Sequence, residues 1–313
     1  MIGQGDTELA YTGPPNTSSL VNVSTAAVQQ TSDSSWDPPI TIISTILLVI
    51  GVAGNTIVII LVSTRKELRT PTFTAIACLS VADLLCLCTR YVYTINGIEN
   101  GMGEQAWNMY GTVTFYFLHS ANFHIVLIAY LRYVFITKPL QSVKITTKSV
   151  LKMSGGVWFA GILTGSLYCF RIIMELHENI TGKNSVLIEL IFGIYIAFVP
   201  FLFIVVLHII KIFQLKKTSY LSPEQPSSIS RKMSLMLFVI IVIYLLSTIP
   251  LLANMILHLI CFLIDFRLTE CQFFFFYHNI SVTSLFLLLN NAVNPLIYFF
   301  FSPPSLKVLR RIK

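Results

Sequence analysis

The sequence contains few charged residues. Only 11% of its 313 residues are Asp, Glu, Lys or Arg, whereas hydrophobic residues make up 55%. A soluble domain carries about 25% charged residues, so this chain lacks the charge needed to cover a surface that faces water. The apolar residues also occur in long runs, which argues against a soluble protein with one large core. The composition therefore predicts an integral membrane protein.

The sequence also lacks the residue groups that enzymes use. It contains no cluster of metal ligands, no glycine-rich nucleotide-binding loop and no nucleophile paired with a base. No secretory signal peptide is visible, because no short apolar stretch follows a basic start. An enzyme is therefore the least favoured class.

Seven segments are apolar enough, and long enough, to cross a membrane as helices, which takes about 20 residues each. They cover residues 39–64, 72–95, 110–136, 149–173, 186–212, 234–263 and 273–301, and the third and seventh are the most polar. We expect an all-α membrane protein with a seven-helix bundle over residues 39–302. Residues 1–38 are rich in Ser, Thr, Asn and Gln, which is typical of a disordered tail. Residues 303–313 fit a short amphipathic helix on the inner leaflet, or alternatively a frayed basic tail.

Basic residues indicate the orientation in the membrane. If the N-terminus is outside, most of the 21 Lys and Arg residues fall in the inner loops, as the positive-inside rule requires. Glycosylation sequons at Asn16, Asn22 and Asn179 then share the outer face. The net charge of +7 is split among loops that flank apolar spans, which disfavours nucleic-acid binding. We expect a multi-pass protein of the plasma membrane in contact with lipid.

Polar side chains interrupt three of the apolar spans. Asn55 stands in the first span, Asp83 in the second, and Asn290 and Asn294 in the seventh. Such groups are costly in a membrane unless they are paired or hydrated, so we expect one shared polar network. Pro295 removes a backbone donor and loosens the seventh helix beside that network.

These residues resemble the signature of rhodopsin-like (class A) G-protein-coupled receptors. The matching motifs follow the family order over residues 41–313: Gly54-Asn55, Leu79 with Asp83, Arg132-Tyr133, Trp158, Pro200, Pro250 and Asn294-Pro295-Leu296-Ile297-Tyr298. The resemblance implies a receptor that binds an extracellular ligand and activates a heterotrimeric G protein as the inner end of helix six swings outward.

The resemblance also implies roles for single residues. Asp83, Asn290 and Asn294 would form a central polar site that often holds sodium in the family. Arg132 would contact the G protein in the active state, and Tyr298 would swing inward to support it.

The sequence departs from the family where an acid usually holds the receptor inactive. Leu131 replaces the acid that precedes the arginine, and the start of the sixth span, Ser230-Arg231-Lys232, carries none. Even about 1.4 kcal/mol shifts a two-state equilibrium tenfold, so we hypothesise raised basal activity. Alternatively, another contact, with Tyr133 or a loop backbone, holds the inactive state.

Other family positions are also replaced. Thr248 stands in place of the tryptophan two residues before Pro250, with Tyr244 one turn below. His208 replaces a tyrosine of the fifth span. Ala121 replaces a serine of the sodium site, which makes sodium binding uncertain.

The family's outer disulfide cannot form, because Trp107 occupies its position in the third span and residues 174–185 contain no cysteine. Cys261 and Cys271 flank the third outer loop, where they form either a local bridge or two reduced thiols. We expect the four cysteines within the spans, Cys78, Cys86, Cys88 and Cys169, to pack as small apolar groups.

The spans also limit the ligand. Thr114 stands where amine receptors carry an aspartate, and the seventh span has no lysine for retinal. Arg90 lies about 10 Å above Asp83 and could bind the carboxylate of a peptide or anionic small molecule. Alternatively, Arg90 snorkels outward or pairs with Glu104 or Glu189. Glu189 and Asn254 are weaker candidates for a ligand pocket.

Two other functions compete with a signalling receptor. Leu131, Thr248 and His208 would also suit a non-signalling decoy receptor. A seven-span transporter is disfavoured because no internal repeat is visible and because we expect only Asp83 and Arg90 to be deeply placed charges.

Overall fold

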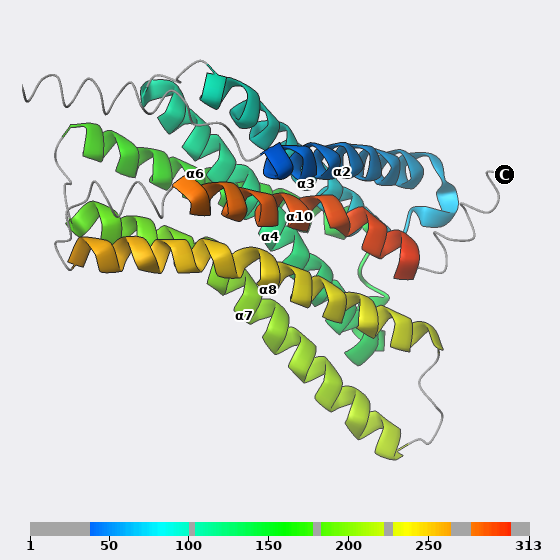
Figure 1. Ribbon diagram of the computed structural model, residues 1–313. Helices are drawn as coiled ribbons and strands as arrows, with labels where there is room; N and C mark the ends of the chain where they lie inside the picture. Colours follow the sequence, from blue (N-terminus) through cyan, green and yellow to red (C-terminus); the bar gives the residue numbers. More distant parts are fainter. Residues whose placement is uncertain (1–37, 100–103, 178–182, 222–227, 264–276, 302–313) are drawn as a thin grey trace, which may run out of the picture. The chain divides into compact units, whose positions relative to one another are not determined.

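The computed structural model describes residues 38–99, 104–177, 183–221, 228–263 and 277–301. This part of the chain is helical and contains no strand (Figure 1). Seven long helices correspond one to one with the seven predicted spans: α2 (Pro38–Thr64), α3 (Pro71–Glu99), α4 (Glu104–Thr137), α6 (Thr147–Leu176), α7 (Lys183–Leu221), α8 (Ser228–Leu263) and α10 (Tyr277–Phe301). Two short helices, η2 (Lys66–Leu68) and α5 (Pro139–Ser142), lie in the connections.

Six of these helices are long and apolar enough to cross a membrane, and α10 has a shorter apolar stretch at Leu285–Tyr298. That stretch includes the polar residues Asn290, Asn291 and Asn294. Several helices also extend beyond the predicted spans. α7 continues to Leu221 rather than residue 212, and α8 begins at Ser228 rather than 234. Hydropathy marks where apolar residues end, whereas a helix can continue past the membrane with polar residues.

Local sequence explains how the inner connections begin their helices. Pro71 opens α3 and Pro139 opens α5, both at positions where the missing N–H costs nothing. Thr146 caps α6, because its side chain accepts a hydrogen bond from the backbone N–H of Ser149 at 3.2 Å. These short connections keep successive helices close together.

α4 packs against α3, α6 and α7, and also against the short helix α5. α8 packs against α7 and α10, and α10 also packs against α3. A close approach brings α2 to α3 and α10: a Cβ at Gly51 would lie 2.7 Å from the Leu87 side chain and 3.0 Å from Ala292. Small residues at such contacts are typical of membrane helix bundles.

The helices place apolar side chains outside and polar ones inside. Large residues such as Phe159, Phe203 and Phe238 are exposed, whereas Asn55, Asp83 and Asn291 are fully buried. This arrangement suits a protein surrounded by lipid, because buried polar groups find partners there that hydrocarbon cannot offer.

Candidate functional site: a polar network along the bundle interior

The structure brings the predicted network of α2, α3 and α10 together. Asn294 Nδ2 donates a hydrogen bond to Asp83 Oδ2 at 2.8 Å, and both side chains are buried. Asn55 Nδ2 donates to the backbone oxygens of Gly51 at 2.9 Å and Asn291 at 3.1 Å. The amide of Asn55 thus links α2 to α10, and the carboxylate of Asp83 links α3 to α10.

The residues around Asp83 offer oxygen ligands that suit sodium. In the described part of the chain, several buried oxygens have no hydrogen-bond partner, and Asp83 Oδ1, Asn290 Oδ1 and Ser80 Oγ are among them. Ser80 stands one turn from Asp83, and Asn290 one turn from Asn294. Ala121 is buried but contributes no oxygen. A sodium ion would be held here by Asp83 and Asn290, with Asn294 beside them. The ion would supply the positive charge that a buried carboxylate needs.

A different kind of metal site finds no support in the described residues, where no three His, Cys, Asp or Glu side chains lie together. Ser80 is the member of the oxygen set that the sequence analysis missed. Its spacing from Asp83 on one helix was the available signal.

Arg132 and Tyr298 lie near each other at the inner end of the network. Tyr298 is buried, and the two residues interact electrostatically. Among the described residues, neither Tyr298 OH nor Arg132 Nε has a hydrogen-bond partner, and no acid forms an ion pair with Arg132. Leu131 is buried in the apolar core. Tyr133 packs its ring against Lys138, whose Nζ lies 5.6 Å from the ring centroid.

Pro200 creates a second polar junction, between α4, α7 and α8. Proline has no backbone N–H, so the oxygen of Ile196, four residues earlier, loses its usual donor within the helix. Asn122 Nδ2 of α4 donates to this oxygen at 2.9 Å. Tyr244 OH of α8 donates to Ala197 O at 2.9 Å and approaches Ile196 O at 3.4 Å. Side chains of two neighbouring helices thus bind the backbone that the proline disturbs.

The Thr248 hydroxyl, in contrast, bonds within its own helix. Thr248 stands two residues before Pro250, which lies inside α8. Its hydroxyl donates a hydrogen bond to the backbone oxygen of Tyr244 at 2.7 Å. Among the described residues, Thr248 therefore makes no polar contact between helices at the place where the family has its tryptophan.

Three polar residues of α4 that the sequence analysis did not select also bind neighbouring helices. Besides Asn122, His119 Nε2 lies 2.8 Å from Tyr195 OH of α7, and His124 Nε2 lies 2.8 Å from Ser154 Oγ of α6. The unusual polarity of the third span was the available signal, because polar groups there need partners on other helices.

The four ligand candidates lie on four different helices. Arg90 of α3, Thr114 of α4, Glu189 of α7 and Asn254 of α8 are partly buried. In the described part of the chain the buried hydroxyl of Thr114 has no hydrogen-bond partner. A Glu189 carboxylate oxygen lies 4.0 Å from the guanidinium of Arg171.

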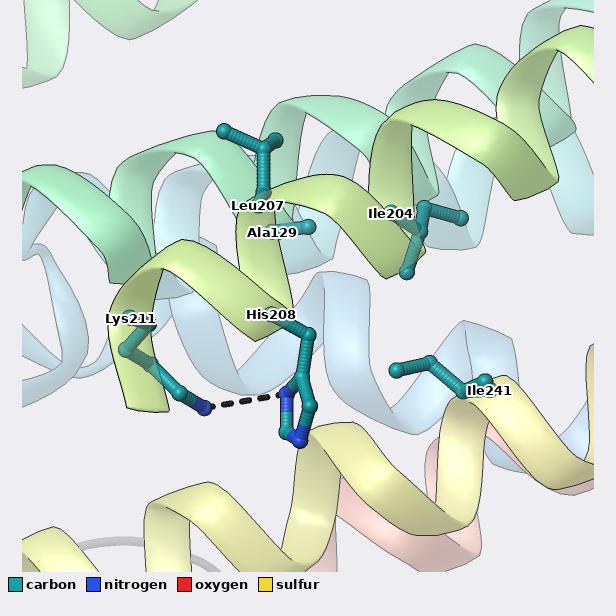
Figure 2. Close-up of a pocket in the computed structure, with 6 residues that line it drawn as sticks. All are labelled: Ala129, Ile204, Leu207, His208, Lys211 and Ile241. Carbon is teal, nitrogen blue, oxygen red and sulfur yellow. Dashed lines mark hydrogen bonds between the residues drawn. The ribbon is translucent and has the colours of Figure 1, made fainter. Parts of the chain in front are cut away.

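The expectation that only Asp83 and Arg90 are deeply placed charges is wrong. Arg171 of α6 is 9% exposed and forms an ion pair with Glu175 at 2.6 Å. Lys211 of α7 is 1% exposed. Arg171 pairs with Glu175, an exposed residue of its own helix, and Lys211 lies 3.2 Å from His208 Nδ1 (Figure 2).

Four cysteines in the spans are free thiols, as expected. Cys86 is buried, but the expectation that Cys88 packs inside is wrong, because it is exposed on the surface of α3. Several predictions concern residues outside the described part of the chain. They are the glycosylation sites Asn16, Asn22 and Asn179, the bridge between Cys261 and Cys271, the side chain of Ser230 and the helix over residues 303–313.

Comparison with known proteins agrees with this geometry. Residues 54–298 match the model of the 7 transmembrane receptor (rhodopsin family). The chain is 23% identical to human cysteinyl leukotriene receptor 1 over 296 residues, which is 90% of this chain and 86% of that receptor. It is 26% identical to the guinea pig (Cavia porcellus) receptor of the same name over 270 residues, 80% of this chain and 77% of that one.

A match to human olfactory receptor 2Z1 has 28% identity over 127 residues and covers 39% of this chain and 40% of that receptor. The family model covers most of the chain, including every motif from Gly54 to Tyr298. The chain therefore belongs to the rhodopsin family of seven-transmembrane, G-protein-coupled receptors, which are multi-pass proteins of the plasma membrane and not enzymes.

Proposed function

We propose that this receptor detects an extracellular ligand, with its N-terminus outside, and activates a heterotrimeric G protein. The main support is the state of Arg132: it lies beside Tyr298, and no acid among the described residues forms an ion pair with it. The ion pair that usually stabilises the inactive state of the family is thus absent among the described residues. This supports signalling with a raised basal level.

The test is nucleotide exchange on a panel of purified G-protein families, with membranes that contain the full chain. We expect ligand-free exchange on at least one family, and its loss in Arg132→Ala. Lys152→Ala is the matched control, because Lys152 is an exposed inner-side cation. Equal exchange in wild type and Arg132→Ala would contradict the proposal.

We propose an anionic ligand, either a small molecule or a peptide carboxylate, bound by Arg90. Arg90 is partly buried near the outer end of α3, and its guanidinium can bind a carboxylate with two hydrogen bonds. The name of the relative cysteinyl leukotriene receptor 1 gives a first compound class for screening. Arg90→Ala should lower the potency of an active compound about tenfold or more at equal surface expression. Unchanged potency would exclude Arg90 as the anion partner.

The competing function is a decoy receptor, favoured by the Thr248 hydroxyl that bonds only within α8 among the described contacts. A decoy would bind a compound from the screen and remain silent with every G-protein family. Nucleotide exchange in any family would exclude this function.

A further inference from the structure

Arg171 lies buried near the end of α6, with two carboxylates beside it. Its guanidinium donates a hydrogen bond to Glu175 Oε2 of the same helix at 2.6 Å. The carboxylate of Glu189, near the start of α7, lies 4.0 Å from the same nitrogen. The Arg171 side chain is 10% exposed, whereas those of Glu175 and Glu189 are 43% and 40% exposed. The buried cation therefore joins two half-exposed acids that belong to two helices.

Aromatic rings connect Arg171 to a third helix. The guanidinium carbon lies 5.4 Å from the ring centroid of Tyr168, which is a distance typical of cation–π contacts. Tyr168 stacks on Phe115 of α4, with 4.7 Å between centroids and 4° between planes. Phe192 of α7 meets these rings edge-on, at 5.4 Å from Tyr168 and 5.3 Å from Phe115. We call this group the Arg171 cluster; it consists of Phe115, Tyr168, Arg171, Glu175, Glu189 and Phe192.

The Arg171 cluster joins the elements that the family's outer disulfide would join. That bridge ties the top of helix three, here α4, to the loop between helices four and five, here α6 and α7. The sequence excludes the bridge, because Trp107 occupies the helix-three position and residues 174–185 contain no cysteine. Of the six candidate spans, α6 also has the smallest buried share, 11%. Apolar packing alone therefore holds α6 less firmly than the other spans.

Arginine suits this position better than other residues. Its planar guanidinium stays charged, stacks on an aromatic ring and can donate to carboxylates at the same time. A cation inside a membrane span is costly unless it is paired, and both acids remain partly exposed, so their own desolvation cost is small. Lysine would keep the charge but lose the planar contact with Tyr168, and an apolar residue would lose both contacts.

We propose that Arg171 is a positioning residue that holds the outer ends of α4, α6 and α7 together in place of the missing disulfide. It acts through the Arg171 cluster, which contains no covalent bond between helices. The cluster also fixes Glu189, which is a candidate for the ligand pocket, and this consequence rests on the proposed function. The outer ends of the three helices should separate more readily when Arg171 is removed.

A native cysteine can report this separation. Cys169 is a free, partly exposed thiol directly after Tyr168, and Cys78 in the inner half of α3 is a free, partly exposed reference. The purified full chain in lipid nanodiscs is treated with N-ethylmaleimide, and peptide mass spectrometry gives the labelling rate of each thiol. In Arg171→Met we expect the rate at Cys169 to rise about 3- to 30-fold, the combined effect of one cation–π contact and one half-exposed ion pair. The rate at Cys78 should not change.

Arg171→Lys separates the contact from the charge. Lysine keeps the positive charge near Cys169, so a smaller rise in this variant cannot come from a change in the reactivity of the thiol. Glu189→Gln should also raise the rate slightly, and it should add nothing to Arg171→Met, because the two residues share one contact. Lys152→Met, at an exposed lysine of the inner end of α6, should leave the rate unchanged.

Two results would overturn the proposal. The first is an equal labelling rate at Cys169 in the wild type and in Arg171→Met. The second is an equal rise at Cys169 and Cys78, which would mean that the whole bundle loosens rather than its outer end. The measurement needs neither a ligand nor a G protein, so its outcome is distinct from that of the signalling assay.

Discussion

The hydrogen bond between Tyr244 of α8 and Ala197 of α7 should oppose activation, and Tyr244→Phe removes it alone. The Tyr244 side chain is fully buried, and its hydroxyl donates to Ala197 O at 2.9 Å. Phenylalanine keeps the ring, which stacks on Phe201 with 6.5 Å between centroids. The substitution therefore changes one interhelical hydrogen bond and little of the packing.

The size of the effect follows from the energy of one hydrogen bond. A typical intramolecular hydrogen bond contributes about 0.5 to 1.5 kcal/mol. In our proposal, signalling requires the inner end of α8 to leave α7, so the Tyr244 bond stabilises only the state described here. Its loss should raise the active fraction about 2- to 12-fold while that fraction is small, since about 1.4 kcal/mol is a factor of ten.

The assay is ligand-free nucleotide exchange on the coupled G protein, normalised to the amount of receptor at the cell surface. Ser247→Ala is the matched control, because the Ser247 hydroxyl is buried but donates to Ile243 O of its own helix at 2.7 Å. We expect exchange to rise in Tyr244→Phe and to stay unchanged in Ser247→Ala. Unchanged or lower exchange in Tyr244→Phe would refute the view that this junction restrains α8.

Three further predictions concern the restraint, the polar network and the packing. Leu131→Asp restores the missing acid and should lower ligand-free nucleotide exchange per receptor at the cell surface. Leu131→Ala is the control for lost packing. If Leu131→Asp lowers exchange no more than Leu131→Ala does, the missing acid is not the cause of basal activity. Replacing sodium by choline in the buffer should raise ligand-free nucleotide exchange in the wild type but not in Asp83→Asn. An equal rise of exchange in both proteins would exclude Asp83 as a sodium ligand. Gly51→Ala places a Cβ 2.7 Å from Leu87 and 3.0 Å from Ala292, and overpacking typically costs about 1 to 3 kcal/mol. Its unfolding midpoint should fall by about 2 to 10 °C, whereas Gly155→Ala, where a Cβ meets nothing within 4 Å, should leave the midpoint unchanged or slightly higher.

Much of the fold and part of the site could be predicted from the sequence. The seven helices follow from apolar runs of membrane length, since a bilayer forces each such run to satisfy its own backbone hydrogen bonds. The contacts of Asn55 and Asp83 with α10 also followed, because an amide or carboxylate in an apolar run needs a partner on another helix. Asn55 and Asp83 therefore both contact α10, and the roles of the other network residues stay predictions.

The junction at Pro200 could not be predicted in the same way. The sequence places a proline in the fifth span, which frees the oxygen of Ile196, but it does not show which side chain reaches that oxygen. Asn122 and Tyr244 do so only because α4 and α8 both pack against α7. The spacing of residues along one helix contains no information about that alignment.

The sequence by itself determined that this chain spans the membrane, in what order its motifs occur, and that its family acid is replaced by Leu131. The tertiary structure alone decided that Lys211 is buried and that Arg171 of α6 approaches Glu189 of α7. The physical reason is that a membrane helix is apolar both toward lipid and toward its neighbours. Hydropathy therefore locates a span but does not identify its inner face, which is set by the packing of the helices.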